Sequence, residues 1–600
     1  MNEITLPQNQ SKEFGELPVW ELSDLYSGPE GDDLEAAFEE AARQIGVFAS
    51  SYDGKVEELD GELFGQAIVA YESISDLLGR IGSFAQLYQS QNIGDSDRGR
   101  FYQNTIDRMT TLSSRTLFFT LSINRLDDEA LETKLSDPVA ARYRPWLRDL
   151  RVYKDHELSD ALERLLHEKY VTGRAAWTRL FDETEAGIRC AVDEEVLTLT
   201  EALNRLSDTK SERRRSAAKA IGNALGEKGS LFAYITNVMA KDKSIEDEWR
   251  KYPRPVSSRN MANLVEDEVV DALVAAAKGA YADTSHRYYA LKARWLGKSK
   301  LEYWDRNAPL PSAENRVIQW DEAKATVLDA YAGFTPEMAE TAAPFFERGW
   351  IDAPAFPGKA SGAFSHPTVP SAHPYILLNY LGSPRDVMTL AHELGHGVHQ
   401  VLAAGQGTLL CDTPLTLAET ASVFGEMLTF RSLLEKEGRA EQRRALLAGK
   451  VEDMLNTVIR QVAFHEFERQ VHDERKKGEL SLQHICEIWM AVQSESLGPA
   501  FRFDEEYKYY WTYVSHFVHV PFYVYAYAFG DCLVNSLYKV YTEGAVPDFE
   551  GKYLEMLKAG GTLRHKELLA PFGLDASDPA FWARGMETLT GLIDELEMVA

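Results

Sequence analysis

The stretch SPRDVMTLAHELGHGVHQVL, residues 383–402, is the part of the chain whose local structure is most strongly specified by its residues. Ser383 can cap the start of a helix, Pro384 suits the first helical position, and Asp386 supplies an acid to the first turn. The residues that follow have helical composition. We therefore expect one helix that begins at Ser383 and carries the two central histidines.

Within that helix, residues 392–396 read His-Glu-Leu-Gly-His, an HExxH motif. Residues four apart lie on one helical face, about 6 Å apart along the axis, so His392 and His396 can both bind one zinc ion. Glu393 beside them is placed to act as the base that activates a water molecule. The motif arises by chance only roughly 0.03 times in such a chain, which favours a metal site over two surface histidines. Gly395 costs a helix about 1 kcal/mol relative to alanine, which indicates that another element packs closely there.

A catalytic zinc ion usually has three protein ligands and one open position, so a third ligand has to come from elsewhere in the chain. His399 lies roughly 10 Å along the axis from His392, which is too far for both to share an ion with His396. His399 is expected either to support the site from outside the ligand set or to be an ordinary helix histidine. A carboxylate from a second helix is the alternative ligand.

That second helix is predicted to begin at Thr413-Pro414 and to carry Glu419 and Glu426 on one face. Glu419 is the predicted third ligand, because the intervening chain is long enough for the second helix to return beside the first. It could instead be the capping-box partner of Thr416. Glu426 is a competing ligand, or else it orients one of the ligating histidines.

These motifs resemble the thimet oligopeptidase and oligoendopeptidase F family of zinc peptidases. The resemblance lies in AHELGHGVHQ (391–400) and in LAETASVFGEML (417–428), where family members place the glutamate ligand. Shorter matches fit the oligoendopeptidase F branch better than the thimet branch: SGAFS (361–365), PYILLNY (374–380) and HFVHVPFYVYAYAFG (516–530). The likeness covers roughly residues 200–590, with a weaker match in LHEKYVTGRAAWTRLFDE (166–183).

The resemblance implies a mainly α-helical fold, with two helical lobes that enclose a deep substrate channel and a small β-sheet next to the zinc helix. The residue patterns support the helices, since residues 33–250 are serially amphipathic. They also support the sheet, because residues 362–365 and 375–380 have strand character. We expect an N-terminal helical lobe over residues 1–200 and a catalytic domain over residues 201–600.

A dense run of histidine and tyrosine occupies residues 516–527. Family members use a histidine and tyrosines of this region to hold the substrate and the oxyanion, which by resemblance implies such roles for His516 and Tyr523. A strand would place all three tyrosines of the run on one face, whereas a helix opened by Pro521 would leave one of them apart. An aromatic core stripe is a further alternative. The competing residues are His519, Tyr525 and Tyr527.

The predicted function is hydrolysis of internal bonds in short oligopeptides, with one Zn²⁺ per chain. The zinc would be bound by His392, His396 and Glu419, with Glu393 as the base. Two other classes stay open: a zinc hydrolase of non-peptide amides, and a degenerate peptide-binding protein without catalysis. The cleavage preference and the physiological peptide do not follow from the sequence.

The composition limits the kinds of binding partner and the cellular compartment that we expect for this protein. A net charge of −29 argues against nucleic acid and against an anionic membrane surface as partners. The four cysteines form no CxxC pair, so neither a disulfide framework nor a thiolate metal site is expected. The first residues contain acids and no apolar core of an export signal, and no apolar stretch reaches the ~18 residues of a membrane span. We expect a cytoplasmic monomer or homodimer.

Overall fold

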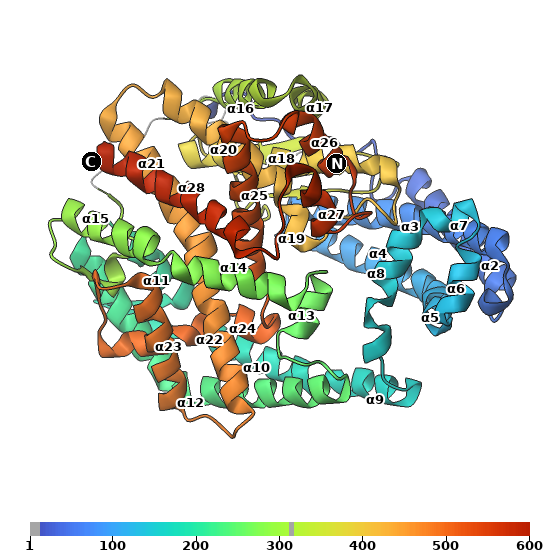
Figure 1. The fold of residues 1–600 in the computed structure, drawn as a ribbon, viewed down its shortest axis with the longest axis horizontal. Helices are drawn as coiled ribbons and strands as arrows, with labels where there is room; N and C mark the ends of the chain where they lie inside the picture. The colour runs from blue at the N-terminus through green and yellow to red at the C-terminus, as the bar shows by residue number, and fades with distance from the viewer. Residues whose placement is uncertain (1–12, 311–316, 600) are drawn as a thin grey trace. The chain divides into compact units, whose positions relative to one another are not determined.

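The computed structural model describes residues 13–310 and 317–599, and α-helices make up most of this part of the chain (Figure 1). Its strands are short and form two two-stranded sheets and one three-stranded sheet within the described residues. The predicted mainly α-helical fold with a small sheet is therefore confirmed. No helix of the described residues is both long enough and apolar enough to cross a membrane.

The chain divides into two compact units, each assembled from three separate segments. The first unit comprises Met1–Val152, Asn315–Lys436 and Gly544–Leu574. Its helices are α2 (Asp32–Tyr52), α3 (Gly61–Ser90), α4 (Ser96–Ser113), α5 (Leu117–Arg125), α6 (Asp128–Lys134), α7 (Pro138–Arg142), α8 (Arg144–Leu150), α16 (Trp320–Phe334), α17 (Pro336–Glu347), α18 (Pro384–Ala403), α19 (Leu415–Ala418), α20 (Thr420–Lys436), α26 (Phe549–Lys558) and α27 (His565–Leu569). Its strands are β4 (Ile351–Pro354), β5 (Phe364–His366) and β6 (Tyr375–Tyr380).

The second unit comprises Tyr153–Glu314, Glu437–Glu543 and Asp575–Ala600. Its helices are α9 (Asp160–Tyr170), α10 (Arg174–Ala186), α11 (Leu199–Asn204), α12 (Ser211–Trp249), α13 (Ser257–Ala262), α14 (Asp267–Gly279), α15 (Arg287–Trp295), α21 (Ala440–Met454), α22 (Arg460–Arg475), α23 (Leu482–Leu497), α24 (His516–His519), α25 (Tyr525–Glu543) and α28 (Pro579–Met598). Its strands are β1 (Arg189–Val192), β2 (Glu195–Thr198), β3 (Leu301–Glu302) and β7 (Phe501–Arg502).

The boundaries of these units differ from the division expected from the sequence. Helices α2 to α8 belong to the first unit, whereas α9, α10 and the β1–β2 hairpin belong to the second. The two units are defined by spatial compactness, and each combines segments that are distant along the chain. They therefore do not test where functional domains begin. The division into residues 1–200 and 201–600 stays a prediction.

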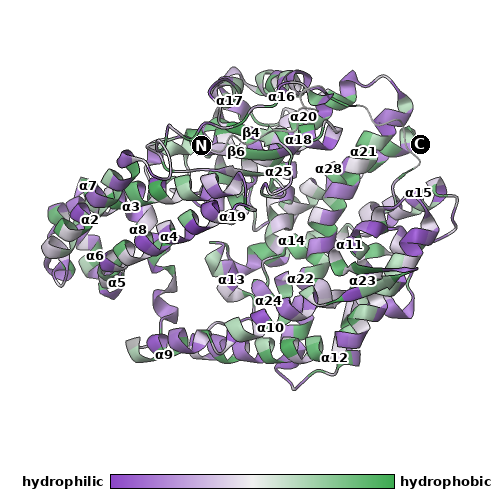
Figure 2. Ribbon diagram, turned by 180° about the vertical axis from the view of Figure 1, so that it is seen from behind, coloured by the Kyte–Doolittle hydropathy of each residue, from purple (hydrophilic) through white to green (hydrophobic). Residues whose placement is uncertain are grey.

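Each unit has its own apolar core. In the first unit the aromatic rings of Phe48, Phe64 and Phe119 pack together from α2, α3 and α5. In the second unit α12 contributes Ile221 and Phe232 to a core that also contains residues of α22 and α23. Hydrophobic and hydrophilic residues alternate around helices such as α12, as expected when one side of a helix is buried (Figure 2).

Helix α18 begins as its sequence predicts. The Asp386 backbone N–H donates to Ser383 Oγ at 3.2 Å, and the Ser383 N–H donates to Asp386 Oδ2 at 2.9 Å. Pro384 follows the cap at the first helical position, where its missing N–H costs nothing. The helix is therefore fixed at its start by a reciprocal capping box.

A three-stranded sheet with the order β4-β6-β5 packs against α18. β6 occupies the predicted residues Tyr375–Tyr380 and is the central strand, parallel to β4 and antiparallel to β5. β5 lies at Phe364–His366, two residues later than expected, and is an outer strand. β4 was not predicted, because its four residues Ile-Asp-Ala-Pro carry no alternating pattern even though all four are buried.

The prediction of a single helix that begins at Thr413-Pro414 is wrong in two respects. Pro414 is the residue before the first helical position, with no side-chain cap from Thr413, and the helix is interrupted at Glu419. α19 ends at Ala418 and α20 begins at Thr420. The Glu419 carbonyl accepts the first hydrogen bond of the new helix, from the N–H of Val423 at 3.1 Å. Glu419 thus stands at the start of α20 and not in the middle of a helix.

Helix α20 passes directly against α18 at Gly395. A Cβ placed on this glycine would lie 2.4 Å from the Ala421 carbonyl oxygen and 2.6 Å from Ser422 Cα. Both neighbours are backbone atoms, which cannot rotate away as a side chain can. The close packing expected from an internal glycine is confirmed.

We predict that Gly395→Ala destabilises the first unit, although alanine is the better helix former. The added methyl group would force α18 and α20 apart, and overpacking of this kind costs about 1–3 kcal/mol. The measurement is the midpoint of thermal unfolding, with Gly333→Ala as the matched control. Gly333 is a helical glycine of α16 with no atom near its absent Cβ, so this substitution should be neutral or stabilising. Equal midpoints for the two variants would contradict the packing argument.

Candidate active site

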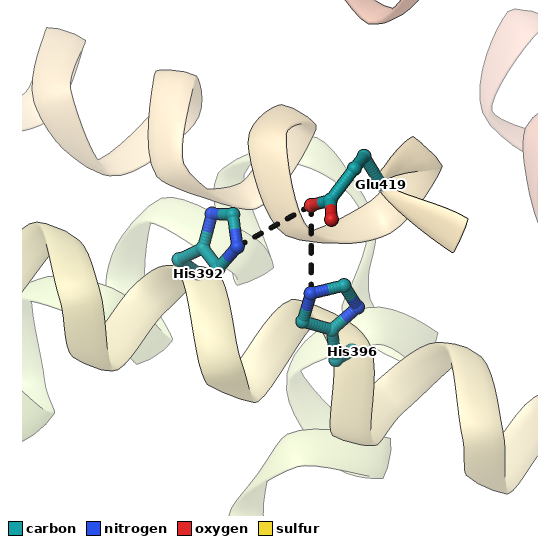
Figure 3. Close-up of side chains that lie close together, drawn as sticks. All are labelled: His392, His396 and Glu419. Carbon is teal, nitrogen blue, oxygen red and sulfur yellow. Dashed lines mark ion pairs between the residues drawn. The ribbon is translucent and has the colours of Figure 1, made fainter. Parts of the chain in front are cut away.

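Three side chains of the first unit converge at the contact of α18 with the start of α20. Glu419 Oε2 lies 3.3 Å from His392 Nε2 and 3.5 Å from His396 Nε2 (Figure 3). Both imidazoles point from α18 toward the same carboxylate oxygen. Among the described residues this is the one group of at least three potential ligands whose donor atoms gather closely enough to hold a metal ion.

The donor set fits zinc in type and in spacing. Zinc is bound by imidazole nitrogen and carboxylate oxygen at about 2.0–2.1 Å, so two ligands of a tetrahedral ion lie about 3.3 Å apart. The separations between Glu419 and the two histidines agree with that value. The three side chains are 19–32% exposed, which leaves one side of the group accessible for a further ligand.

Further contacts fix the orientation of each predicted ligand. Glu426 Oε2 lies 3.1 Å from His392 Nδ1, on the side of the ring that faces away from Glu419. The Ser422 hydroxyl donates to Glu419 Oε2 at 2.6 Å, and the His396 ring forms a hydrogen bond with the Ala418 backbone. Glu426 is thereby placed to orient a histidine, and it lies outside the group of ligand atoms.

His399 is buried and does not join the ligand group. Its Nε2 lies 3.3 Å from the Thr413 hydroxyl, and its ring also bonds to the Ala418 backbone. His399 and His396 both border a pocket of about 410 Å³ in this unit, together with Trp350. His399 therefore links α18 to the segment that leads into α19.

Glu393 lies next to the ligand group but is almost completely buried, with 7% of its surface exposed. Burial raises the pKa of its carboxyl to about 7, although a hydrogen bond from the backbone of Ser365 favours the charged form. Ser365 belongs to the outer strand β5. The predicted base is thus anchored to the strand that borders α18.

The carboxylates around the two histidines create a strongly negative environment. Burial alone would lower the pKa of His392, but hydrogen bonds with Glu419 and Glu426 raise it to about 10. Burial likewise raises the pKa of Glu419, yet the neighbouring histidines and the Ser422 hydroxyl bring it down to about 2. The arrangement stabilises positive charge at its centre, which suits a divalent cation.

The histidine and tyrosine run belongs to the second unit and is not a strand. It forms the short helix α24, a left-handed residue at Phe522 with φ 61°, and the start of α25. His516 Nε2 lies 3.3 Å from the Tyr527 hydroxyl, and the His516 ring stacks near that of Tyr523. The Tyr523 and Tyr527 rings contact each other with centroids 5.3 Å apart.

The other two candidates of this run, Tyr525 and His519, contact other residues of the second unit. Tyr525 is fully buried, and its hydroxyl accepts a hydrogen bond from Asn263 at 2.8 Å. His519 Nε2 pairs with Asp182 at 2.7 Å. His516, Tyr523 and Tyr527 form one cluster, so Tyr523 and Tyr527 share a side as the helical alternative expected. The helix itself begins at Tyr525 and not at Pro521.

One positioning residue could not be found from the sequence. The Tyr331 hydroxyl of α16 donates to the Ala391 carbonyl of α18 at 2.6 Å, directly before the first histidine. A Cβ on Gly425 of α20 would lie 2.3 Å from the same hydroxyl. Tyr331 therefore joins three helices at the metal group, but no local motif marks it.

Comparison with known families agrees with this geometry. A family model described as Peptidase family M3 matches residues 206–588, and one described as Oligopeptidase F matches residues 122–189. The first match alone spans more than half of the chain. The chain belongs to peptidase family M3. The predicted resemblance to metallopeptidases of this kind is confirmed, and the two matches lie on either side of residue 200.

Relatives of the family cover nearly the whole chain. Oligopeptidase PepF of Bacillus subtilis (strain 168) is 25% identical over 592 residues, which cover 96% of this chain and 87% of the relative. An oligoendopeptidase F homolog of Lactococcus lactis is 27% identical over 476 residues, which cover 76% and 78% of the two chains.

Solved structures share the same fold. Oligoendopeptidase-F from Enterococcus faecium superposes with a TM-score of 0.70 at 22% identity, covering 94% of this chain and 98% of that one. A protein from Chlamydophila abortus assigned to the peptidases gives a TM-score of 0.86 at 22% identity, covering 97% and 98%. At these identities the likeness extends to the fold alone.

We predict that Glu426→Gln weakens metal binding while leaving the ligands in place. An amide lacks the negative charge that orients His392 and raises its basicity, and losses of such partners typically cost 10–100-fold in affinity. A competition titration with a chromophoric chelator measures the zinc affinity directly. Glu435→Gln, an exposed glutamate of the same helix, is the matched control and should leave the affinity unchanged. Equal affinities for both variants would contradict the orienting role.

Proposed function

We propose that this chain is a zinc-dependent endopeptidase that hydrolyses internal bonds of short oligopeptides. The observation that carries the proposal is the convergence of His392, His396 and Glu419, with the buried Glu393 next to them. Membership of peptidase family M3 supports the reaction class. The names of the relatives, oligopeptidase and oligoendopeptidase F, support peptides as substrates.

In this proposal His392, His396 and Glu419 would hold one zinc ion per chain. Zinc supplies Lewis-acid chemistry, polarising a carbonyl and lowering the pKa of water to roughly 7. Glu393 accepts a proton from the water that attacks the scissile carbonyl, and then passes that proton to the leaving amine. Its burial excludes competing solvent, and the Ser365 backbone holds the carboxylate in position.

Tyr523 and His516 are proposed to donate hydrogen bonds to the oxyanion that develops on the attacked carbonyl. Their rings lie together in one partly exposed cluster with Tyr527, which supports a shared role in substrate contact. The family resemblance favours Tyr523 over Tyr527. One such donor contributes about 3 kcal/mol in other enzymes.

The outer strand β5 is proposed to bind the substrate main chain by strand addition. The proposal concerns β5 and not β6 (Tyr375–Tyr380), because β6 has strands on both sides and offers no free edge. Among the described residues β5 pairs with a strand on one side only, and its Ser365 contacts Glu393 and Gln400. Main-chain recognition would make cleavage depend on peptide length and conformation more than on one side chain.

We predict that Glu393→Gln retains zinc and the fold but lowers kcat for a ten-residue peptide by about 10²–10⁴-fold. Glutamine keeps the shape of the side chain and cannot accept the proton. A quenched peptide measures turnover, while metal analysis and thermal unfolding verify that zinc and stability are preserved. Full activity of this variant would refute the assignment of Glu393 as the base.

The same assay separates the other classes of function. Wild-type protein that binds zinc and peptides but cleaves none would be a degenerate binding protein. Cleavage of non-peptide amides without cleavage of peptides would indicate the other class of hydrolase. Digestion of an unfolded protein as fast as a ten-residue peptide would refute the restriction to oligopeptides.

We predict that Tyr523→Phe lowers kcat by about 100-fold with little change in KM, because the lost hydroxyl acts mainly on the transition state. Steady-state kinetics on the same peptide provide the test. Tyr525→Phe is the matched control: losing its buried bond with Asn263 should cost about 1 kcal/mol of stability and leave kcat unchanged. If Tyr527→Phe lost turnover and Tyr523→Phe did not, the assignment would pass to Tyr527.

The remaining expectations are proposals of the same kind. The absence of nucleic-acid and anionic membrane partners agrees with the charge of −29. A cytoplasmic location and a monomer or homodimer stay predictions. A substrate channel between two lobes follows from the family resemblance.

A further inference from the structure

Two arginines of the second unit both act on the rings of Tyr289 and Tyr507, and neither has an acidic partner among the described residues. Arg460 is the first residue of α22, and Arg306 follows the short β3 strand. No carboxylate oxygen of the described residues lies within ion-pair distance of either guanidinium group. Glu452 is the acid whose charge acts on Arg306, but it is already bonded to the Lys292 ammonium and to a tyrosine hydroxyl.

Most N–H donors of these two arginines also have no hydrogen-bond partner among the described residues. Arg460 Nη2 donates to the Tyr513 hydroxyl at 3.2 Å, while its Nε is shielded from solvent and has no hydrogen-bond partner. Arg306 Nε donates at 3.3 Å to the side chain of its neighbour Asn307. A buried donor without a partner is costly, and such donors in native proteins usually serve a ligand or water.

Aromatic rings lie around the pair, and both arginines keep partial contact with solvent. The Arg460 guanidinium lies 4.9 Å from the centre of the Phe464 ring, and the buried rings of Tyr289 and Tyr507 lie nearby. Burial, followed by repulsion from Arg306, lowers the pKa of Arg460 below its ordinary value. The charge of Arg460 also reaches His516, one of the proposed substrate contacts.

Cations that are fully buried elsewhere in the described residues show what a structural role looks like. Arg214 pairs with Asp305 at 2.7 Å, and Lys359 pairs with Asp352 at 2.6 Å. Lys292 is equally buried and is paired with Glu452. Where a buried cation has no acid, as at Lys134, backbone carbonyls accept its hydrogen bonds. Neither arginine of this pair has a carboxylate or a backbone carbonyl as hydrogen-bond partner among the described residues.

We propose that Arg306 and Arg460 bind a carboxylate group of the peptide substrate. The inference rests on the proposed peptidase function. A planar guanidinium presents paired N–H groups that match the two oxygens of a carboxylate, and two such groups can hold one carboxylate from both sides. Every free peptide carries this group at its C-terminus, and aspartate or glutamate side chains carry the same chemistry.

The test compares two forms of one peptide that contains no acidic side chain: the free acid and the C-terminal amide. We expect wild-type protein to cleave the free acid with a kcat/KM about 10–100-fold higher, as charge-assisted hydrogen bonds to a carboxylate would give. Arg460→Gln should remove this preference and leave cleavage of the amide within about 3-fold of wild type. Arg306→Gln should act in the same direction.

Arg469→Gln is the matched control on the same helix. Arg469 is partly exposed and already paired with Glu466 at 2.9 Å, so its loss should leave the preference intact. Thermal unfolding of each variant identifies any that fails to fold, and the wild-type comparison of acid with amide requires no variant.

Further peptides distinguish the source of the carboxylate. If the C-terminus is bound, lengthening the free acid at its N-terminus keeps the cleaved bond at a fixed distance from the C-terminus. If a side chain is bound, an aspartate moved along the amide restores the preference and moves the cleaved bond with it. Either result supports the site.

Three results would overturn the inference. The first is equal kcat/KM for acid and amide in the wild type, and the second is an equal loss on both substrates in Arg460→Gln. The third is a preference that exists only in chloride buffer, which would assign the arginines to an inorganic anion. Calorimetric binding of both peptides to Glu393→Gln repeats the comparison without turnover, so failure of the proposed peptidase activity does not by itself decide it.

Discussion

The contact between the backbones of α18 and α20 at Gly395 is the constraint on which the candidate site depends. Because no side chain separates the helices there, Glu419 at the start of α20 reaches the two histidines of α18. Gly425 allows Tyr331 of α16 the same close approach, and its hydroxyl ties down the backbone of α18. Because Gly395 and Gly425 have no side chains, three helices can pack closely at one place. This close packing matters because a displacement of 1 Å is enough to impair positioned chemistry.

Local signals in the sequence predicted local structure well. The cap at Ser383 and the strand Tyr375–Tyr380 both follow from short-range rules of hydrogen bonding and side-chain alternation. Glu419 was found because a metal motif requires a third ligand. The interruption of the helix at Glu419 was missed, because no helix-breaking residue marks it in the sequence. Tyr331 and the backbone of Ser365 reach the site from distant segments and carry no motif.

Charge is distributed differently at the two places where ligands are proposed. Around His392, carboxylates outnumber the cations of the protein itself, so a bound cation would complete the balance. Around Arg460, the excess is positive in a chain whose net charge is −29. Elsewhere, buried cations such as Lys359 and Arg214 are paired with acids, and that of Lys134 is bonded to backbone carbonyls. At both places a ligand of opposite sign would compensate the excess charge.

Stability alone gives no reason to retain the arginine pair. Two neighbouring guanidinium groups repel each other and lose hydration, and apolar residues of similar volume are often as stable as even a paired buried charge. The tyrosines around Arg460 lower the local polarity, which raises the cost of the unpaired Nε and also strengthens any bond formed to an incoming anion. The low polarity around Arg460 thus causes both the energetic cost in the free protein and the strength of the bond to a bound carboxylate. An arrangement that is unfavourable when empty and favourable when occupied is what a binding site requires, whereas a structural ion pair would be complete within the chain.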